Sequence, residues 1–174
     1  MTDKKKIFLL RFINTLFFIL LITFQYSGMF EIKIFNANPM LPLSLLVACC
    51  MFSSELTSTV CGLLVGIFTD CVSSTPQGFN TIIFMIIALA VSLTAKHLFN
   101  NNIFSSFALC FLCGTFYFGM RWLFCFAFSL SLTENLSYIM QFALPSVIYT
   151  SVVIIPLYFI ERALYNKLHF LYHK

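Results

Sequence analysis

The sequence predicts an all-α protein, a polytopic membrane helix bundle of about six transmembrane helices. Composition is the first indication, because 60% of the 174 residues are hydrophobic and only 9% are charged. A soluble domain carries about 25% charged residues, which it needs for a solvated surface. The second indication is a succession of apolar stretches near the length of about 20 residues that a helix needs to cross the hydrocarbon layer. An apolar exterior is stable in lipid, so a membrane bundle explains both observations.

The expected spans are residues 8–30, 39–53, 55–72, 80–97, 103–127 and 138–160. The first follows a run of lysines, but it exceeds the roughly 7–15 apolar residues of a signal peptide, so we expect it to be retained. The second begins with Pro39 and Pro42, and only Ser53 and Ser54 separate it from the third, which predicts a tight hairpin with a short second helix. No linker is long enough to divide domains. The sequence therefore predicts a single integral membrane domain over residues 1–174.

The distribution of Lys and Arg predicts the orientation, since positive charge concentrates in cytoplasmic segments. With the N-terminus inside, eight of the ten cationic residues are cytoplasmic: Lys4, Lys5, Lys6, Arg11, Lys96, Arg162, Lys167 and Lys174. The other two, Lys33 and Arg121, are on the outer side. We therefore expect both termini in the cytoplasm. The net charge of +4 arises from residues near the chain ends, so no nucleic-acid partner is expected.

The third span carries the most informative pattern in the chain. Ser58, Gly62, Gly66 and Asp70 recur at every fourth residue, so they share one face of a helix. Gly62 and Gly66 form a GxxxG pair, which lets two helix backbones approach closely in lipid. The neighbour is either another helix of the same chain or a helix of a partner protein. The pattern therefore marks a helix-packing or partner-binding face.

Asp70 is expected near membrane depth, where a carboxylate is costly and usually functional. A turn containing Pro76 and Gly78 follows it, and Asn80 is a candidate N-cap of the fourth span. Arg121 has a similar expected depth in the fifth span, so we predict a buried ion pair between Asp70 and Arg121. The alternatives are that Asp70 reaches headgroup water and that Arg121 extends outward to the interface.

No catalytic, cofactor-binding or metal-binding residues are predicted. The sequence has no HExxH, GxSxG or phosphate-binding glycine loop. Cys110 and Cys113 have the CxxC spacing of a redox dithiol, but buried cysteines among Phe and Leu more often act as small hydrophobic residues. An intramembrane enzyme with residues from distant helices is the weaker alternative.

Three segments together resemble the rod shape-determining protein MreD family: Pro39-Met-Leu-Pro-Leu43, Gly62-Leu-Leu-Val-Gly66-Ile-Phe-Thr-Asp70 and Thr75-Pro76-Gln-Gly78-Phe-Asn80-Thr. Their order matches that family: a Pro-initiated second helix, a glycine-spaced third helix ending in Asp, and a Pro-x-Gly turn. The resemblance covers roughly residues 39–99. The fourth span departs from it, with Ala88 and Ala90 where more glycine is expected.

The resemblance implies a non-enzymatic scaffold of the bacterial cell-elongation complex in the inner membrane, without a cofactor. The implied partners are an MreC-like single-span coiled-coil protein, a RodA-type glycosyltransferase, a penicillin-binding transpeptidase and, indirectly, MreB-like filaments. The positions carried over are Gly62, Gly66, Asp70, Pro76 and Gly78, as determinants of fold or partner docking.

The family also resembles in fold the S components of energy-coupling-factor vitamin transporters, and a substrate-binding S component is the alternative function. Many S components carry small alanine-spaced residues on the first helix for docking to a coupling subunit. The first expected span, residues 8–30, contains no Ala, which favours the scaffold.

Overall fold

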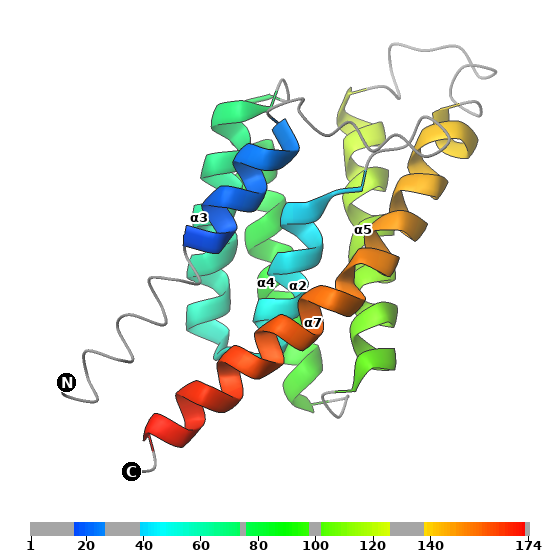
Figure 1. Cartoon of the computed structure of the whole chain (residues 1–174). Helices are drawn as coiled ribbons and strands as arrows, with labels where there is room; N and C mark the ends of the chain where they lie inside the picture. The colour runs from blue at the N-terminus through cyan, green and yellow to red at the C-terminus, as the bar shows by residue number, and fades with distance from the viewer. Residues whose placement is uncertain (1–15, 27–38, 74–75, 98–101, 126–137, 173–174) are drawn as a thin grey trace.

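The computed structural model describes residues 16–26, 39–73, 76–97, 102–125 and 138–172, which form a helical bundle without strands in these ranges (Figure 1). The helices are Leu16–Tyr26, α2 (Leu41–Phe52), α3 (Glu55–Val72), α4 (Phe79–His97), α5 (Ile103–Cys125), the π-helix η1 (Ile139–Ala143) and α7 (Leu144–Tyr172). This architecture confirms the predicted all-α polytopic bundle.

Within the described ranges, four helical stretches are long and apolar enough to cross a membrane: Glu55–Val72, Phe79–Lys96, Ile103–Phe124 and Ile139–Asn166. The helices Leu16–Tyr26 and α2 are apolar but shorter. Residues 8–15 and 27–30 of the first expected span, and residues 126–127 of the fifth, lie outside the described ranges. The division into one domain with six spans stays a prediction.

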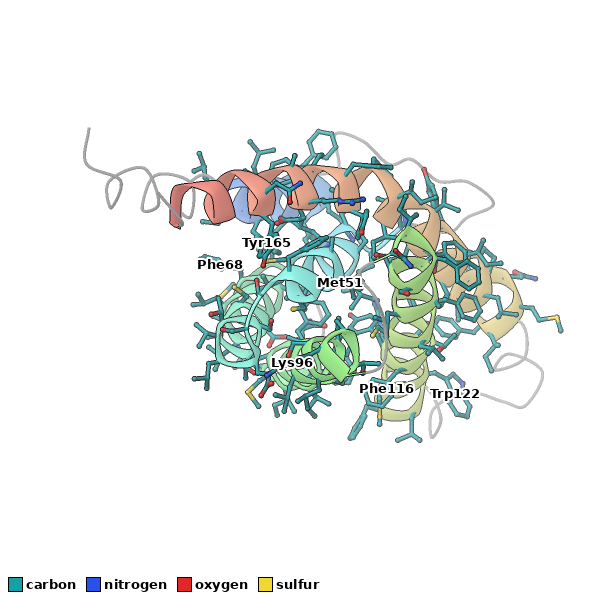
Figure 2. All side chains as sticks on the ribbon, turned by 90° about the horizontal axis from the view of Figure 1, so that it is seen from below. Met51, Phe68, Lys96, Phe116, Trp122 and Tyr165 are labelled. Carbon is teal, nitrogen blue, oxygen red and sulfur yellow. The ribbon has the colours of Figure 1, made fainter. Side chains whose placement is uncertain are left out.

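The short helix α2 lies at the centre of the bundle. Its 12 residues make it about 18 Å long, little more than half of the roughly 30 Å hydrocarbon thickness. It contacts α3, α4, α5 and α7, and every residue from Pro42 to Met51 is buried. Figure 2 shows this arrangement from below, with Met51 near the middle of the bundle. Such complete burial explains why α2 is hydrophobic on all sides rather than amphipathic.

The buried start of α2 is capped by side chains from distant parts of the chain. The Leu41 N–H donates to Gln25 Oε1 at 2.7 Å, and the Met40 N–H donates to Thr150 Oγ1 at 3.0 Å. The next residue, Pro42, has no N–H that needs an acceptor. Because unpaired backbone donors are costly in an apolar interior, these caps allow α2 to begin inside the bundle.

The last helical segment, η1 with α7, crosses the bundle diagonally in Figure 1. In η1 the backbone widens, and the Leu144 N–H donates to the carbonyl of Ile139. Pro145 follows and has no N–H for the carbonyl of Gln141, which favours a wider turn at this point. Pro156 lies inside α7.

Candidate functional site: the hairpin of α3 and α4

The helices α3 and α4 form an antiparallel hairpin, and the face of α3 that the sequence singled out lies within it. Ser58, Gly62, Val65, Gly66 and Thr69 are the buried residues of α3. The opposite face is apolar and exposed, with Leu56 and Val60 among its members. The four-residue spacing thus places the small residues inward and the large ones outward.

The two glycines are the points of closest approach between the helices. A Cβ added at Gly62 would lie 2.6 Å from the carbonyl oxygen of Phe84 and 2.7 Å from the Cβ of Ala88. A Cβ at Gly66 would overlap the backbone of Thr81, and would lie 2.9 Å from its nitrogen. No real side chain fits at these distances. The GxxxG pair therefore packs against a helix of the same chain, which is the first of the two interpretations.

The departure at Ala88 fits this geometry. Its methyl group is fully buried opposite Gly62, so the pair consists of a glycine on α3 and an alanine on α4. Alanine is small enough to face a glycine on the neighbouring helix, because the two backbones can still approach closely. Glycine is not required on the α4 side.

Asp70 joins the outer end of α3 to the first turn of α4. Its Oδ1 accepts hydrogen bonds from the Asn80 N–H at 3.1 Å and from Asn80 Nδ2 at 2.9 Å. Its Oδ2 accepts from the Thr81 N–H at 2.9 Å and from Thr81 Oγ1 at 2.6 Å. The half-buried carboxylate thus satisfies two backbone donors at the positive end of the α4 dipole. Asp70 is a cap supplied by the neighbouring helix.

Asn80 does not act as a local N-cap but connects four parts of the chain. Its amide donates to Asp70 and, at 3.0 Å, to Ser73 Oγ in the turn. Its Oδ1 accepts a hydrogen bond from the hydroxyl of Tyr117 on α5 at 2.8 Å. Asn80 and Tyr117 are almost completely buried, so this network links α3, the turn, α4 and α5 away from water.

Pro76 and Gly78 shape the turn before α4. The Pro76 carbonyl accepts from the Phe79 N–H at 3.1 Å, and the Gly78 carbonyl accepts from the Ile82 N–H at 3.1 Å. Gly78 has a φ of +86°, a left-handed conformation that favours glycine over other residues. Both residues therefore act on the backbone that presents Asn80 and Thr81 to Asp70.

The structure does not bring Asp70 and Arg121 together in an ion pair. Among the described residues the ion pair found is between Lys96 and Glu55, at 2.8 Å, at the other end of the hairpin. Asp70 faces the N-terminus of α4, whose N–H groups supply the positive partial charge that was expected from a guanidinium. Arg121 is half-buried on α5.

The Glu55–Lys96 pair is a feature that sequence reasoning missed, since Lys96 served there only to indicate orientation. It joins the first residue of α3 to the last turn of α4. Together with the glycine contacts and the Asp70 cap, it links the two helices at three levels. The hairpin is thus fixed at both ends and along its length.

The two cysteines of the CxxC pair are buried and free in the structure. The thiol of Cys110 donates to the Thr150 carbonyl at 3.7 Å, which places it between α5 and α7. In the described part of the chain, no three His, Cys, Asp or Glu side chains are grouped as metal ligands would be.

The family model for the rod shape-determining protein MreD matches residues 5–168. The chain belongs to the MreD family. The match covers nearly the whole chain, well beyond residues 39–99 that carried the resemblance, and it supports a role in rod shape determination. No curated protein and no solved structure matches the chain significantly. The likeness of the MreD fold to transporter S components therefore stays a prediction.

Proposed function

We propose that this protein is a non-enzymatic membrane scaffold of the bacterial cell-elongation complex. It binds an MreC-like single-span coiled-coil protein and links MreB-like filaments to a RodA-type glycosyltransferase and a penicillin-binding transpeptidase. The single observation that carries the proposal is the MreD family match over residues 5–168. The S-component alternative has no comparable support.

The hairpin fits such a role because its polar groups stabilise the fold. Asp70 is engaged by Asn80 and Thr81, and the glycines face α4. Ser58, Gly62, Gly66, Asp70, Pro76 and Gly78 then affect partner binding by fixing the shape of the surface that the hairpin presents. None of them takes a catalytic role in this proposal.

The proposed location is the bacterial inner membrane, with both termini in the cytoplasm. The ends of α3 and α4 that carry Glu55 and Lys96 then lie on the cytoplasmic side, and Asp70 lies on the outer side. Labelling of single introduced cysteines in intact cells tests this orientation. A residue of the turn near Gln77 should react with an impermeant maleimide after Cys71, which is exposed, is replaced by serine.

Affinity purification of the tagged chain from mild detergent, with mass spectrometry of the companions, tests the scaffold. We expect a single-span coiled-coil protein together with the two wall synthases. A Gly66→Ile bait should lose them because its hairpin cannot close, whereas a Gly119→Ala bait should keep them, since Gly119 faces open space. Recovery of paired ATPases with a transmembrane coupling subunit would overturn the scaffold and favour the S component.

A further inference from the structure

A pocket of about 520 Å³ lies at the end of the bundle where α2 turns into α3. This volume is within the range of about 300–1,000 Å³ that is typical of small-ligand sites. Its lining combines buried residues such as Met51 and Ser92 with exposed polar residues such as Ser54 and Lys96, and it also includes Tyr165 of α7. Figure 2 looks toward this end and labels Met51, Lys96 and Tyr165. The pocket is separate from the Asp70 network, which is at the opposite end of α3.

The rim of the pocket carries one negative and one positive charge side by side. Glu55 and Lys96 both line it, and they form the 2.8 Å ion pair that closes this end of the hairpin. Their side chains are 37% and 65% exposed, respectively, so both still reach the surroundings. An ammonium group has three donors, and the bond to Glu55 uses one of them. The rim therefore presents a local dipole rather than a net charge.

An apolar stripe of α3 begins at the pocket. Leu56 lines the pocket and is 82% exposed, and it begins a row on the same helix face that continues through Val60, Leu63 and Ile67. The spacing of four, three and four residues keeps the row on one face, over about 16 Å along the helix. Glu55 and Lys96 are the end residues of two candidate membrane spans. The charged rim thus lies at a membrane boundary and the stripe runs from it into the hydrocarbon.

We propose that this pocket binds the headgroup of a zwitterionic aminophospholipid, a phosphate diester that carries a primary ammonium, with one acyl chain along the α3 stripe. The lipid phosphate lies against Lys96 and the lipid ammonium against Glu55, so the two dipoles lie side by side and antiparallel. The primary ammonium donates hydrogen bonds to the carboxylate. An anionic headgroup lacks the group that faces Glu55, and a trimethylated ammonium has no N–H to donate.

Native mass spectrometry of the purified, delipidated full chain tests the proposal. The probes are phosphatidylethanolamine, phosphatidylcholine and phosphatidylglycerol with identical acyl chains. We expect phosphatidylethanolamine to bind about fivefold more tightly than the other two, the size expected for one exposed charge-assisted contact. Glu55→Gln should abolish this preference, and Lys96→Gln should weaken the binding of all three lipids.

Arg162→Gln is the matched control. It removes a charge from an exposed residue of α7 that does not line the pocket, and it should leave the preference unchanged. Equal binding of the three lipids by the unmodified protein would overturn the proposal. So would a Glu55→Gln variant that keeps the preference, or an Arg162→Gln variant that loses it. Circular dichroism establishes that each variant is folded before the lipids are compared.

Discussion

Replacing Asp70 by asparagine changes one atom and tests the junction between α3 and α4. Asparagine keeps one acceptor oxygen and puts an NH₂ group where the second carboxylate oxygen was. If the remaining oxygen of asparagine accepts from Asn80, its NH₂ group faces the backbone N–H and the hydroxyl of Thr81. The hydroxyl can rotate and accept, but the Thr81 N–H, now 2.9 Å from Oδ2, is left facing another donor.

The magnitude follows from two losses. An unsatisfied buried donor costs about 1–3 kcal/mol, and losing a carboxylate at a helix N-terminus costs about 0.3–1 kcal/mol. We therefore expect Asp70→Asn to lower the free energy of unfolding by about 2–3 kcal/mol. For a chain of this size that corresponds to a fall in Tm of roughly 4–12 °C. Thermal unfolding in one mild detergent, followed by circular dichroism, measures it.

A double-mutant cycle distinguishes the cap from the expected ion pair. Because Asp70 makes its hydrogen bonds to Asn80 and Thr81, the effects of Asp70→Asn and Arg121→Gln on Tm should be additive. A large coupling between the two substitutions would refute this reasoning and restore the pair. An Asp70→Asn variant with an unchanged Tm would equally refute the capping role.

Four further substitutions test other parts of the bundle by the same Tm measurement. Gly66→Ala should lower the free energy of unfolding by about 2 kcal/mol or more, because the new methyl group overlaps the backbone of α4. Its control, Gly119→Ala, places the methyl group in open space and should raise the free energy of unfolding by up to about 1 kcal/mol. Equal effects of the two substitutions would contradict the close approach of α3 and α4. Tyr117→Phe should cost about 1–2 kcal/mol, since it removes the hydrogen bond from the Tyr117 hydroxyl to the buried amide oxygen of Asn80. Gln25→Leu should cost about 1–3 kcal/mol by leaving the first N–H of α2 without an acceptor, and a neutral result would mean that water replaces the cap.

The periodic features of this chain were predictable from sequence. The four-residue spacing of Gly62 and Gly66 places them on one helix face wherever the helix lies, and the turn with Pro76 and Gly78 has its own local chemistry. The shared face of the glycines and the turn both depend only on residues that are close together in the sequence. Hence the turn after α3 and the tight face of α3 were expected, and only the identity of the facing helix needed the structure.

The partner of Asp70 was not predictable in the same way. Charge and expected depth pointed to Arg121, because a sequence lists charged side chains but does not list the backbone N–H groups left free at a helix start. The rotation of α4 about its axis decides whether those groups face Asp70. The sequence could have indicated them only through the short separation of 10 residues between Asp70 and Asn80, which keeps the two in reach across a tight turn.

The caps of α2 lay beyond sequence reasoning for a different reason. Thr150 and Met40 are separated by 110 residues, and Gln25 and Leu41 are separated by 16. No local pattern relates such residues. Their pairing is a consequence of how the whole bundle assembles around the short central helix α2.

That pairing has a consequence for biosynthesis. The start of α2 emerges from the ribosome long before Thr150 does, and at about 5–20 residues per second the interval is roughly 5–20 s. During this interval one end of the most buried helix lacks a hydrogen-bond acceptor, and its sides lack α7 throughout and α5 at first. Insertion of the last helix is therefore the step that completes the fold. Chains truncated before it present an open centre that membrane quality-control proteases can recognise.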